Sequence, residues 1–377
     1  MAPVPVDPLR ILHTVRAPVG GIFRHILDLA SGQIERGHHV GIVADSLTGG
    51  ERADAALAEL APRLALGVHR IAIHREPSPL DAMAMMRFAV LTRTLKPHVL
   101  HGHGAKAGVF VRMKRARPDM IRIYTPHGGS LHYPSNTLRG AFYSRLERAL
   151  MNRTDLFLFE SEFARDTYQR MIGTPRGLVR CVFNGVGARE FDPIMTADDA
   201  TEVAYVGEFR HIKGADILID AVAKLRVEGR AVALSLAGDG EEMATLKAQI
   251  DRLGLGQAVR FLGHVPARLG FSKGRVLVVP SRGDSMPYVV IEAAAAGIPM
   301  IAAEVGGIPE IFGPHRGSLV PPNDAAAMAQ AIAHALDHPA EAIERAKLLR
   351  ERVFLNFSQK AMVDGILAAY RDAFTEH

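Results

Sequence analysis

The sequence contains little cysteine, no tryptophan and no long apolar run. Cys181 is the one cysteine in 377 residues, which excludes an internal disulfide and favours a reducing compartment. The longest weakly polar run, residues 289–303, contains Glu292, Gly297 and Pro299, so it is too short and too broken to span a bilayer. The first ten residues lack the basic start and apolar run of a secretory signal. We therefore expect a cytoplasmic protein.

Several signatures of nucleotide and metal binding are also missing. No GxGxxG follows a predicted strand with an acidic residue about 20 positions further on, which disfavours a standard dinucleotide site. Neither a Walker A pattern nor an Asp-X-Asp pair occurs. The usual metal clamp for a sugar diphosphate is therefore absent, and we predict no metal ion. Any diphosphate would have to be neutralised by side chains and by helix N-termini.

The length and the hydrophobic pattern predict two α/β domains. Short apolar runs alternate with amphipathic stretches, which is typical of a parallel sheet covered by helices on both faces. In the first half we expect strands at residues 9–15, 39–44, 68–73, 98–103, 121–125 and 155–160. The helices expected between them are at 21–36, 81–95, 106–117, 137–152 and 161–171.

A second series of the same kind follows the turn dipeptide Asn184-Gly185. We expect strands at residues 203–207, 231–237, 259–262, 276–280 and 300–303, and helices at 215–227, 241–253, 288–296 and 324–336. The predicted domains are residues 1–190 and 191–355. The last helices, roughly residues 340–374, could pack on either domain, and one arrangement has a terminal helix at 356–377 that packs back on the first domain. Ligands of open parallel sheets bind beyond the carboxyl ends of the strands, so we expect two Rossmann-like domains that face each other across a cleft.

Charge is divided unevenly between the two halves. Residues 1–190 hold 26 Lys and Arg against 16 Asp and Glu, and residues 191–377 hold 19 against 24. Basic residues recur in the stretches 106–117 and 139–148. These stretches are either solvated helix faces or a patch for an anionic lipid surface or a diphosphate-linked acceptor. Nucleic acid is not an expected partner, because no aromatic residues are interleaved with the charges.

Three glycine-rich turns follow predicted strands. Gly20 and Gly21 open the first helix. These glycines either allow a phosphate to approach bare backbone N–H groups at the helix start or simply form a turn. The segment 207–214 also opens a helix. Its Arg210 and Lys213 either bind a diphosphate from one side or are solvated cations of a surface loop. Gly238 begins a third turn, Gly238-Asp239-Gly240, at the end of the next strand.

The most informative segment is PSRGDSMPYVVIEA, residues 280–293. A buried strand ends there, Asp284 lies in the loop, Ser285 is a candidate helix cap, and Pro287 suits a first helical turn. Glu292 lies in an otherwise apolar helix, where an unpaired carboxylate is costly. Because a vicinal diol offers two hydroxyl donors to one carboxylate, Glu292 is a candidate ligand for a ribose.

Together these motifs resemble those of GT-B glycosyltransferases of family 4. The tandem architecture and the order of the motifs agree, and so do residues 125–128 (Thr-Pro-His-Gly), 184–186 (Asn-Gly-Val) and 305–310 (Val-Gly-Gly-Ile-Pro-Glu). The resemblance covers essentially the whole chain. It implies retaining, metal-independent transfer of a sugar from a nucleoside-diphosphate sugar.

The resemblance also implies roles for individual residues. The family's two acidic residues with seven between them fall on Asp284 and Glu292, of which the first meets donor-sugar hydroxyls and the second the ribose. The first is usually Glu in the family, so Asp284 is one methylene shorter. The family lysine matches Lys213 directly. The family arginine would fall on Glu208, and Arg210 is expected to replace it.

Further roles follow from the same comparison. Main-chain N–H groups at Ser285, Met286 and the neighbours of Pro287 are expected near the phosphates, although proline itself has no N–H group to donate. His127 matches a histidine near the donor sugar and diphosphate. His101 and His103 lie at the end of the preceding strand, where they could face the acceptor.

The expected function is hexosyl transfer in cell-surface polysaccharide biosynthesis, with a UDP-sugar favoured over a GDP-sugar. The acceptor is expected to be a lipid-linked or saccharide hydroxyl, with peripheral contact at the inner membrane face in the lipid-linked case. Two alternatives remain open. One is a nucleotide-sugar epimerase or phosphorylase on the same fold, and the other is a non-catalytic scaffold of a polysaccharide assembly complex.

Overall fold

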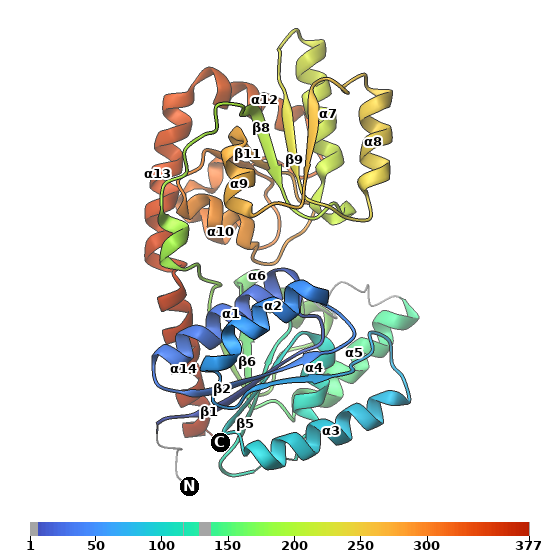
Figure 1. The fold of residues 1–377 in the computed structure, drawn as a ribbon, viewed down its shortest axis with the longest axis vertical. Coiled ribbons are helices and arrows are strands. Elements are labelled where there is room, and N and C mark those ends of the chain that lie inside the picture. Colours follow the sequence, from blue (N-terminus) through green and yellow to red (C-terminus); the bar gives the residue numbers. More distant parts are fainter. Residues whose placement is uncertain (1–6, 116, 128–136, 377) are drawn as a thin grey trace. The chain divides into compact units, whose positions relative to one another are not determined.

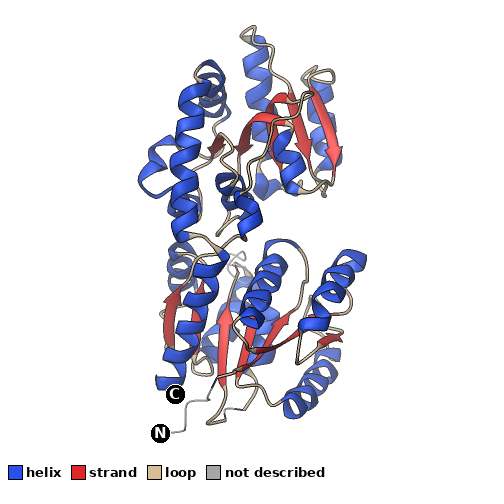
Figure 2. Ribbon diagram, turned by 60° about the vertical axis from the view of Figure 1, so that its left-hand side comes forward, coloured by secondary structure: helices blue, strands red, loops and turns tan. Residues whose placement is uncertain are grey.

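A computed structural model describes residues 7–115, 117–127 and 137–376. The chain divides into two compact units, the first comprising Met1–Gly185 with Gln359–His377 and the second Val186–Ser358. Each unit holds one parallel sheet with helices on both of its faces (Figures 1 and 2). The expected fold class, two doubly wound α/β units in tandem, is confirmed.

The first unit contains a seven-stranded sheet in the order β3-β2-β1-β4-β5-β6-β7. Its strands are β1 (Arg10–Val15), β2 (His39–Asp45), β3 (Val68–Ile71), β4 (Val99–His103), β5 (Ile121–Thr125), β6 (Leu156–Phe159) and β7 (Leu178–Cys181). Its helices are α1 (Gly20–Glu35), α2 (Gly50–Leu60), α3 (Leu80–Leu95), α4 (Ala105–Arg112), α5 (Leu138–Met151), α6 (Glu162–Met171) and α14 (Gln359–Glu376). The order of the strands reverses between β1 and β4, and this is the point where doubly wound sheets bind ligands.

Side chains alternate between the two faces of this sheet. Those of Ile11 and Val15 pack with α1, α2 and α14, whereas Leu12 packs on the opposite face with residues of α3 and α4. His13 lies between Ile11 and Val15 at the same spacing of two, so it faces α1 and α14. The C-terminal helix therefore completes the core of the first unit, and Figure 1 shows it alongside α1.

The second unit contains a five-stranded sheet in the order β10-β9-β8-β11-β12. Its strands are β8 (Thr201–Val206), β9 (Leu234–Ala237), β10 (Val259–Gly263), β11 (Gly274–Val279) and β12 (Met300–Ala302). Its helices are α7 (Ala215–Val227), α8 (Met243–Arg252), α9 (Ala267–Ser272), α10 (Tyr288–Ala295), α11 (Ile308–Phe312), α12 (Ala325–Asp337) and α13 (Pro339–Asn356). The reversal of strand order lies between β8 and β11, so the loops that follow these two strands are neighbours.

Every strand and helix expected from the sequence is present, most of them with shifted ends, but some elements were missed. The edge strand β7 was not expected, because its four residues are all only half-buried and include Arg180, so no apolar run marks it. Helix α2 was missed as well, although Ala53, Leu57 and Leu60 are buried at helical spacing. The final helices separate, since α13 belongs to the second unit and α14 to the first.

Part of the expected basic surface is internal. Arg112 is fully buried, donates to Glu147 at 2.7 Å and stacks over the ring of Tyr124 at 3.8 Å. Arg112 therefore belongs to a structural ion pair of the core, and its side chain cannot contact an acceptor or a lipid. None of the described helices is both long enough and apolar enough to cross a membrane.

Candidate functional site

The loops that follow β8 and β11 are interlocked at the reversal point of the second sheet. The backbone N–H of Arg282 donates to the carbonyl of Ile212 at 2.8 Å. A side chain on Gly214 would place its Cβ 2.1 Å from the carbonyl oxygen of Pro280, and Gly214 also has a φ of +71°. Only glycine allows the two loops to approach this closely.

Charged side chains reinforce the same junction. The Lys213 ammonium donates to Asp284 Oδ2 at 2.5 Å, with both side chains largely covered. Arg282 forms a two-pronged ion pair with Asp216 at the start of α7, at 2.8 and 2.6 Å, and donates to the carbonyl of His211 at 2.6 Å. Burial raises the pKa of Asp216, but the guanidinium of Arg282 outweighs it, so the pKa ends below its ordinary value.

Gly238 is more than a turn residue. A Cβ at this position would lie 1.9 Å from the carbonyl oxygen of Gly207, and a Cβ on Gly240 would lie 2.4 Å from that of Phe209. Phe209 also donates its backbone N–H to the carbonyl of Asp239 at 2.9 Å. The turn after β9 therefore supports the loop that leads to Lys213.

Gly306 and Gly307 support the junction from the other side. Gly306, with a φ of +59°, would place a Cβ 1.5 Å from the carbonyl oxygen of Asp284, and Gly307 would place one 1.9 Å from that of Ser285. The backbone N–H of Gly307 donates to the Asp284 carbonyl at 3.0 Å. These glycines fix the backbone on both sides of the Asp284 side chain.

Helix α10 begins directly after this loop. Pro287 occupies its N-cap position, so Ser285 lies two residues before the N-cap. Met286 is buried beside Pro287. Glu292 is buried, with 8% of its surface exposed, in a helix whose other residues are apolar.

Arg210 is placed differently from Lys213. Its guanidinium lies 3.7 Å from the carboxylate of Glu208, and both side chains are about half exposed. Such an exposed pair is weak, so Arg210 is free to exchange Glu208 for another anion. Glu208, which occupies the position of the family arginine, thus pairs with Arg210, the residue that is expected to replace that arginine.

In the first unit, the glycine turn after β1 faces solvent. Gly20 and Gly21 open α1 with exposed backbone, and Gly20 has a φ of +60°. Gly104 opens α4 after β4 with a φ of +77°, and a Cβ there would lie 3.4 Å from Ile22. The N-termini of α1 and α4, which have no side-chain caps, thus lie close together at the reversal point of the first sheet.

Beside these turns, five imidazole rings are packed together at the carboxyl ends of β1, β4 and β5. They belong to His13, His25, His101, His103 and His127, and neighbouring ring centroids are 3.9 to 5.6 Å apart. Burial lowers the pKa of each ring, to about 4 for His13 and about 3 for His127. For the other three, burial and the neighbouring imidazoles lower the pKa well below its ordinary value. The cluster is therefore uncharged at neutral pH.

The expectation that His101 and His103 face an acceptor was wrong. Both side chains are fully buried, and both rings are engaged in hydrogen bonds. His101 contacts the hydroxyls of Tyr370 and Thr125 at 2.8 Å each. His127 is partly exposed with a φ of +49°, and the next residue of its motif, Gly128, lies outside the described residues.

The described part of the chain contains two triads with enough nitrogen ligands for a transition metal, namely His13–His101–His103 and His25–His103–His127. The ligand atoms of each triad lie within 4.8 Å of one another. In this structure, however, the His13–His103 and His103–His127 contacts measure 3.0 and 3.1 Å, and these are hydrogen-bond distances.

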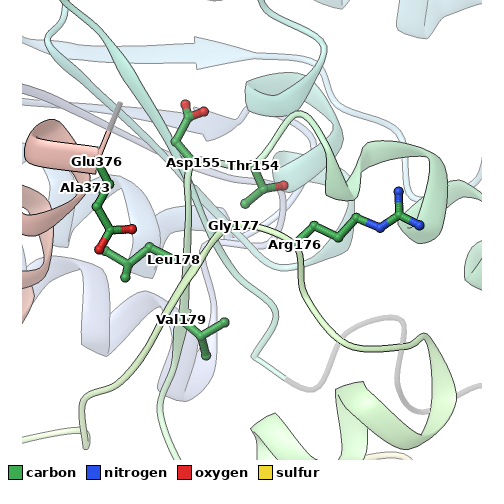
Figure 3. A pocket seen from close by; sticks show the side chains of 8 residues that line it. All are labelled: Thr154, Asp155, Arg176, Gly177, Leu178, Val179, Ala373 and Glu376. Atoms are coloured by element: carbon green, nitrogen blue, oxygen red, sulfur yellow. The ribbon is translucent and has the colours of Figure 1, made fainter. Parts of the chain in front are cut away.

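A pocket of about 460 Å³ lies elsewhere in the first unit (Figure 3). Thr154 and Asp155 precede β6, Arg176 and Gly177 precede β7, and Glu376 belongs to α14. The pocket is therefore at the amino ends of the strands, opposite the edge where parallel sheets bind ligands. Asp155 is also held in an ion pair with Arg122 at 2.9 Å, so we assign the pocket no role.

Two family models match the chain, one in each unit. Glycosyltransferase Family 4 matches residues 19–189, and Glycosyl transferases group 1 matches residues 200–338. The chain is a family 4 glycosyltransferase. The glycogen synthase of Mycobacterium tuberculosis is 25% identical to this glycosyltransferase over 380 residues, 93% of this chain and 91% of the relative.

Solved structures share the GT-B fold of this glycosyltransferase. Sucrose-phosphate synthase from Thermosynechococcus elongatus has a TM-score of 0.80 and 23% identity, and covers 97% of this chain and 99% of its own. HepE of Anabaena in complex with UDP-glucose has a TM-score of 0.79 and 19% identity, and covers 97% of this chain and all of its own.

Sequence reasoning overlooked several residues that hold the sites of this glycosyltransferase in place. Arg282 lay inside the segment singled out from the sequence, but its partner Asp216 is distant in the chain. Gln33 and Tyr370 contact the imidazole cluster from α1 and α14. One signal was available, since His13 is a titratable residue in the middle of a strand whose neighbours are mostly apolar.

Proposed function

We propose that this glycosyltransferase transfers a hexose, with retention and without a metal ion, from a UDP-sugar to a hydroxyl of a lipid-linked or saccharide acceptor. The observation that carries the proposal is the junction of Lys213 with Asp284 between glycine-supported loops at the reversal point of the second sheet. A cation, a carboxylate and the start of α10 meet there. Support for the donor comes from HepE, which was crystallised with UDP-glucose, and support for a polysaccharide product comes from the related glycogen synthase.

In this proposal the leaving diphosphate is stabilised by Lys213, by Arg210 and by the N-terminus of α10. The bond from the anomeric carbon to the phosphate oxygen breaks as the acceptor oxygen attacks from the same face. The acceptor's proton passes to the departing phosphate oxygen, so no separate base is needed, and direct attack from the same face needs no carboxylate nucleophile. Glu292 binds the ribose and Asp284 binds sugar hydroxyls, after exchanging its contact with Lys213 for the donor.

The lipid-linked acceptor is supported by the outer surface of α3. Leu80, Met83, Met86 and Val90 recur every three or four positions and are 48 to 66% exposed. The exposed Arg87 lies between them on the same helix. An apolar stripe with basic neighbours suits the interface of an anionic membrane, so we propose that the protein works at the inner membrane face.

The donor proposal is tested by thermal unfolding with UDP, GDP and ADP, followed by transfer assays with the corresponding sugars. At equal concentration, a ligand that binds the native state more tightly raises the midpoint more, so UDP is expected to give the largest shift. No shift with any nucleotide, together with no donor turnover, would identify a non-catalytic scaffold. Sugar release that requires free phosphate would instead identify a phosphorylase.

The membrane proposal is tested by sedimentation with vesicles of phosphatidylglycerol and phosphatidylcholine. We expect binding to the anionic vesicles and its loss in the double variant Met83→Ser, Met86→Ser. A matched control is Phe354→Ser, Leu355→Ser, which removes exposed apolar side chains from the second unit. Equal binding of all three proteins would contradict the proposal.

A further inference from the structure

Four side chains of the first unit form a continuous hydrogen-bonded chain. Oε1 of Gln33 lies 2.8 Å from Nε2 of His13, and Nδ1 of His13 lies 3.0 Å from Nε2 of His103. Nδ1 of His103 then lies 3.1 Å from Nε2 of His127. The first three members are buried, and His127 ends the chain at a partly exposed position. The chain therefore connects helix α1 to the strand-end turn after β5.

With the Gln33 amide oriented as in the structure, the chemistry of these groups determines the direction of every hydrogen bond. A neutral imidazole has one N–H donor and one lone-pair acceptor, and a Gln carbonyl oxygen only accepts. His13 must then carry its proton on Nε2, so its Nδ1 accepts from Nε2–H of His103. By the same rule, Nδ1 of His103 accepts from Nε2–H of His127. The remaining nitrogen, Nδ1 of His127, is left as a lone pair.

Helix α14 contacts the Gln33 end of this hydrogen-bonded series. Nε2 of Gln33 points to the hydroxyl of Tyr370 at 3.5 Å, and the same hydroxyl lies 2.8 Å from Nδ1 of His101. Because a hydroxyl can donate as well as accept, this contact is compatible with both orientations of the amide, and the structure turns Oε1 towards His13. A reversed amide would reverse every bond in the chain and place the proton of His127 on Nδ1 instead.

The far end of the chain is available to a ligand. Among the residues that the structure describes, none forms a hydrogen bond with Nδ1 of His127. A lone pair there accepts from a hydroxyl group, whereas it has nothing to offer a phosphate oxygen, which is itself an acceptor. Which tautomer His127 adopts thus decides which part of a nucleotide-sugar it can contact.

We propose that Gln33, His13 and His103 are positioning residues that hold His127 as the Nε2–H tautomer, with Nδ1 presented as an acceptor for a hydroxyl. The tautomer itself does not depend on the proposed function. The contact with a substrate hydroxyl does rest on it, and the experiments below separate the two.

The tautomer is measured by long-range ¹H–¹⁵N correlation spectra of protein labelled at histidine nitrogens, at neutral pH and without ligand. The signal of His127 is assigned from its loss in the variant His127→Gln. We expect a protonated Nε2 and an unprotonated Nδ1. A protonated Nδ1 would overturn the proposal, and so would stoichiometric zinc in the purified protein, because a ligated nitrogen carries no proton.

Two variants test the relay, His13→Phe and Gln33→Met, each of which removes one link while roughly conserving volume. In either variant we expect the His127 signals to move to the average of two tautomers. The matched control is His69→Phe, which removes a ring that bonds the carbonyl of Leu66 outside the cluster. An unchanged His127 tautomer in both test variants would refute the relay, and wild-type spectra remain decisive if one variant does not fold.

Kinetics then test the contact with substrate. We expect both variants to lose kcat roughly tenfold, as for one misdirected hydrogen bond, while the Kd for UDP stays unchanged. A parallel loss of UDP affinity would place His127 at the phosphates and refute the hydroxyl contact. If the spectra agree but no transfer is detected with any donor, the relay stands and only the proposed function fails.

Discussion

Lys213 and Asp284 lie 71 residues apart in the sequence and 2.5 Å apart in the structure, measured from Nζ to Oδ2. Their ion pair connects the loop after β8 to the loop after β11. Both side chains are assigned to the donor in the proposed function, so donor binding has to replace this contact. In the proposed function, the ion pair keeps the two groups in place until a diphosphate and a sugar replace it.

Replacing Lys213 tests this arrangement. We expect Lys213→Ala to reduce kcat roughly 10²–10³-fold, since a developing phosphate charge loses a preorganised donor, and to weaken UDP binding. The control is Lys273→Ala, which breaks an ion pair with Asp199 at 2.6 Å in the same unit but away from the junction. Steady-state kinetics and UDP titration measure both effects. Similar turnover in the two variants would exclude Lys213 from the donor site.

A methyl group on Gly306 should displace the Asp284 loop. Its Cβ would lie 1.5 Å from the Asp284 carbonyl, and the φ of +59° adds strain. We expect Gly306→Ala to cost about 1–3 kcal/mol in unfolding free energy and to abolish donor binding. Gly256→Ala is the control, because nothing lies within 4 Å of its added Cβ. Urea unfolding and UDP titration check both variants, and native UDP affinity in Gly306→Ala would contradict the expectation.

Glu292 is expected to recognise the ribose. The test compares UDP with 2′-deoxy-UDP, which lacks one of the two hydroxyl donors. We expect the wild-type protein to prefer UDP by roughly tenfold, the range of one hydrogen bond to a charged group, and Glu292→Gln to lose most of this preference. Isothermal titration measures the four affinities. An undiminished preference in the variant would assign ribose recognition to another residue.

The buried imidazoles should make stability depend on pH. The pKa of His13 is lowered to about 4 by burial, so the unfolded chain binds more protons than the folded one between pH 4 and pH 6.5. The contribution of His13 is therefore fully present above about pH 6.5. It is lost as the pH falls towards 4, by about 1.4 kcal/mol per unit.

Urea unfolding at pH 7.5, 6.5 and 5.5 checks this dependence. We expect the unfolding free energy to fall over the acidic interval, and to fall less steeply in His13→Phe. If the free energy of both proteins changed by the same amount, His13 would not be buried in its neutral form.

The sequence predicted the architecture well because periodicity reports burial directly. Strand β6 (LFLF) is buried on both faces and appears as an apolar run, and α7 was expected over the residues that form it. The edge strand β7 is half-buried and carries no such signal. Element ends shifted by a few residues, because hydrogen bonding and capping decide them rather than hydrophobicity.

The candidate site was predicted less evenly. Sequence motifs predicted Lys213, Asp284 and Glu292 as site residues, but they could not predict contacts between residues that are distant in the sequence. That Arg282 binds Asp216 and that His101 is bonded to Tyr370 depends on the fold, as does the burial of Arg112. The histidines looked alike in the sequence, and only their burial and their hydrogen-bond partners separate them.

The placement of α14 has a consequence for biosynthesis. Domains generally fold in the order in which they leave the ribosome, but the first unit here lacks Tyr370 and the apolar face of α14 until the whole second unit has been translated. The second unit can close its core earlier, from Val186 to Ser358. A nascent or truncated chain would thus expose the helix-binding face of the first sheet, so the half that is made first is the half that matures last.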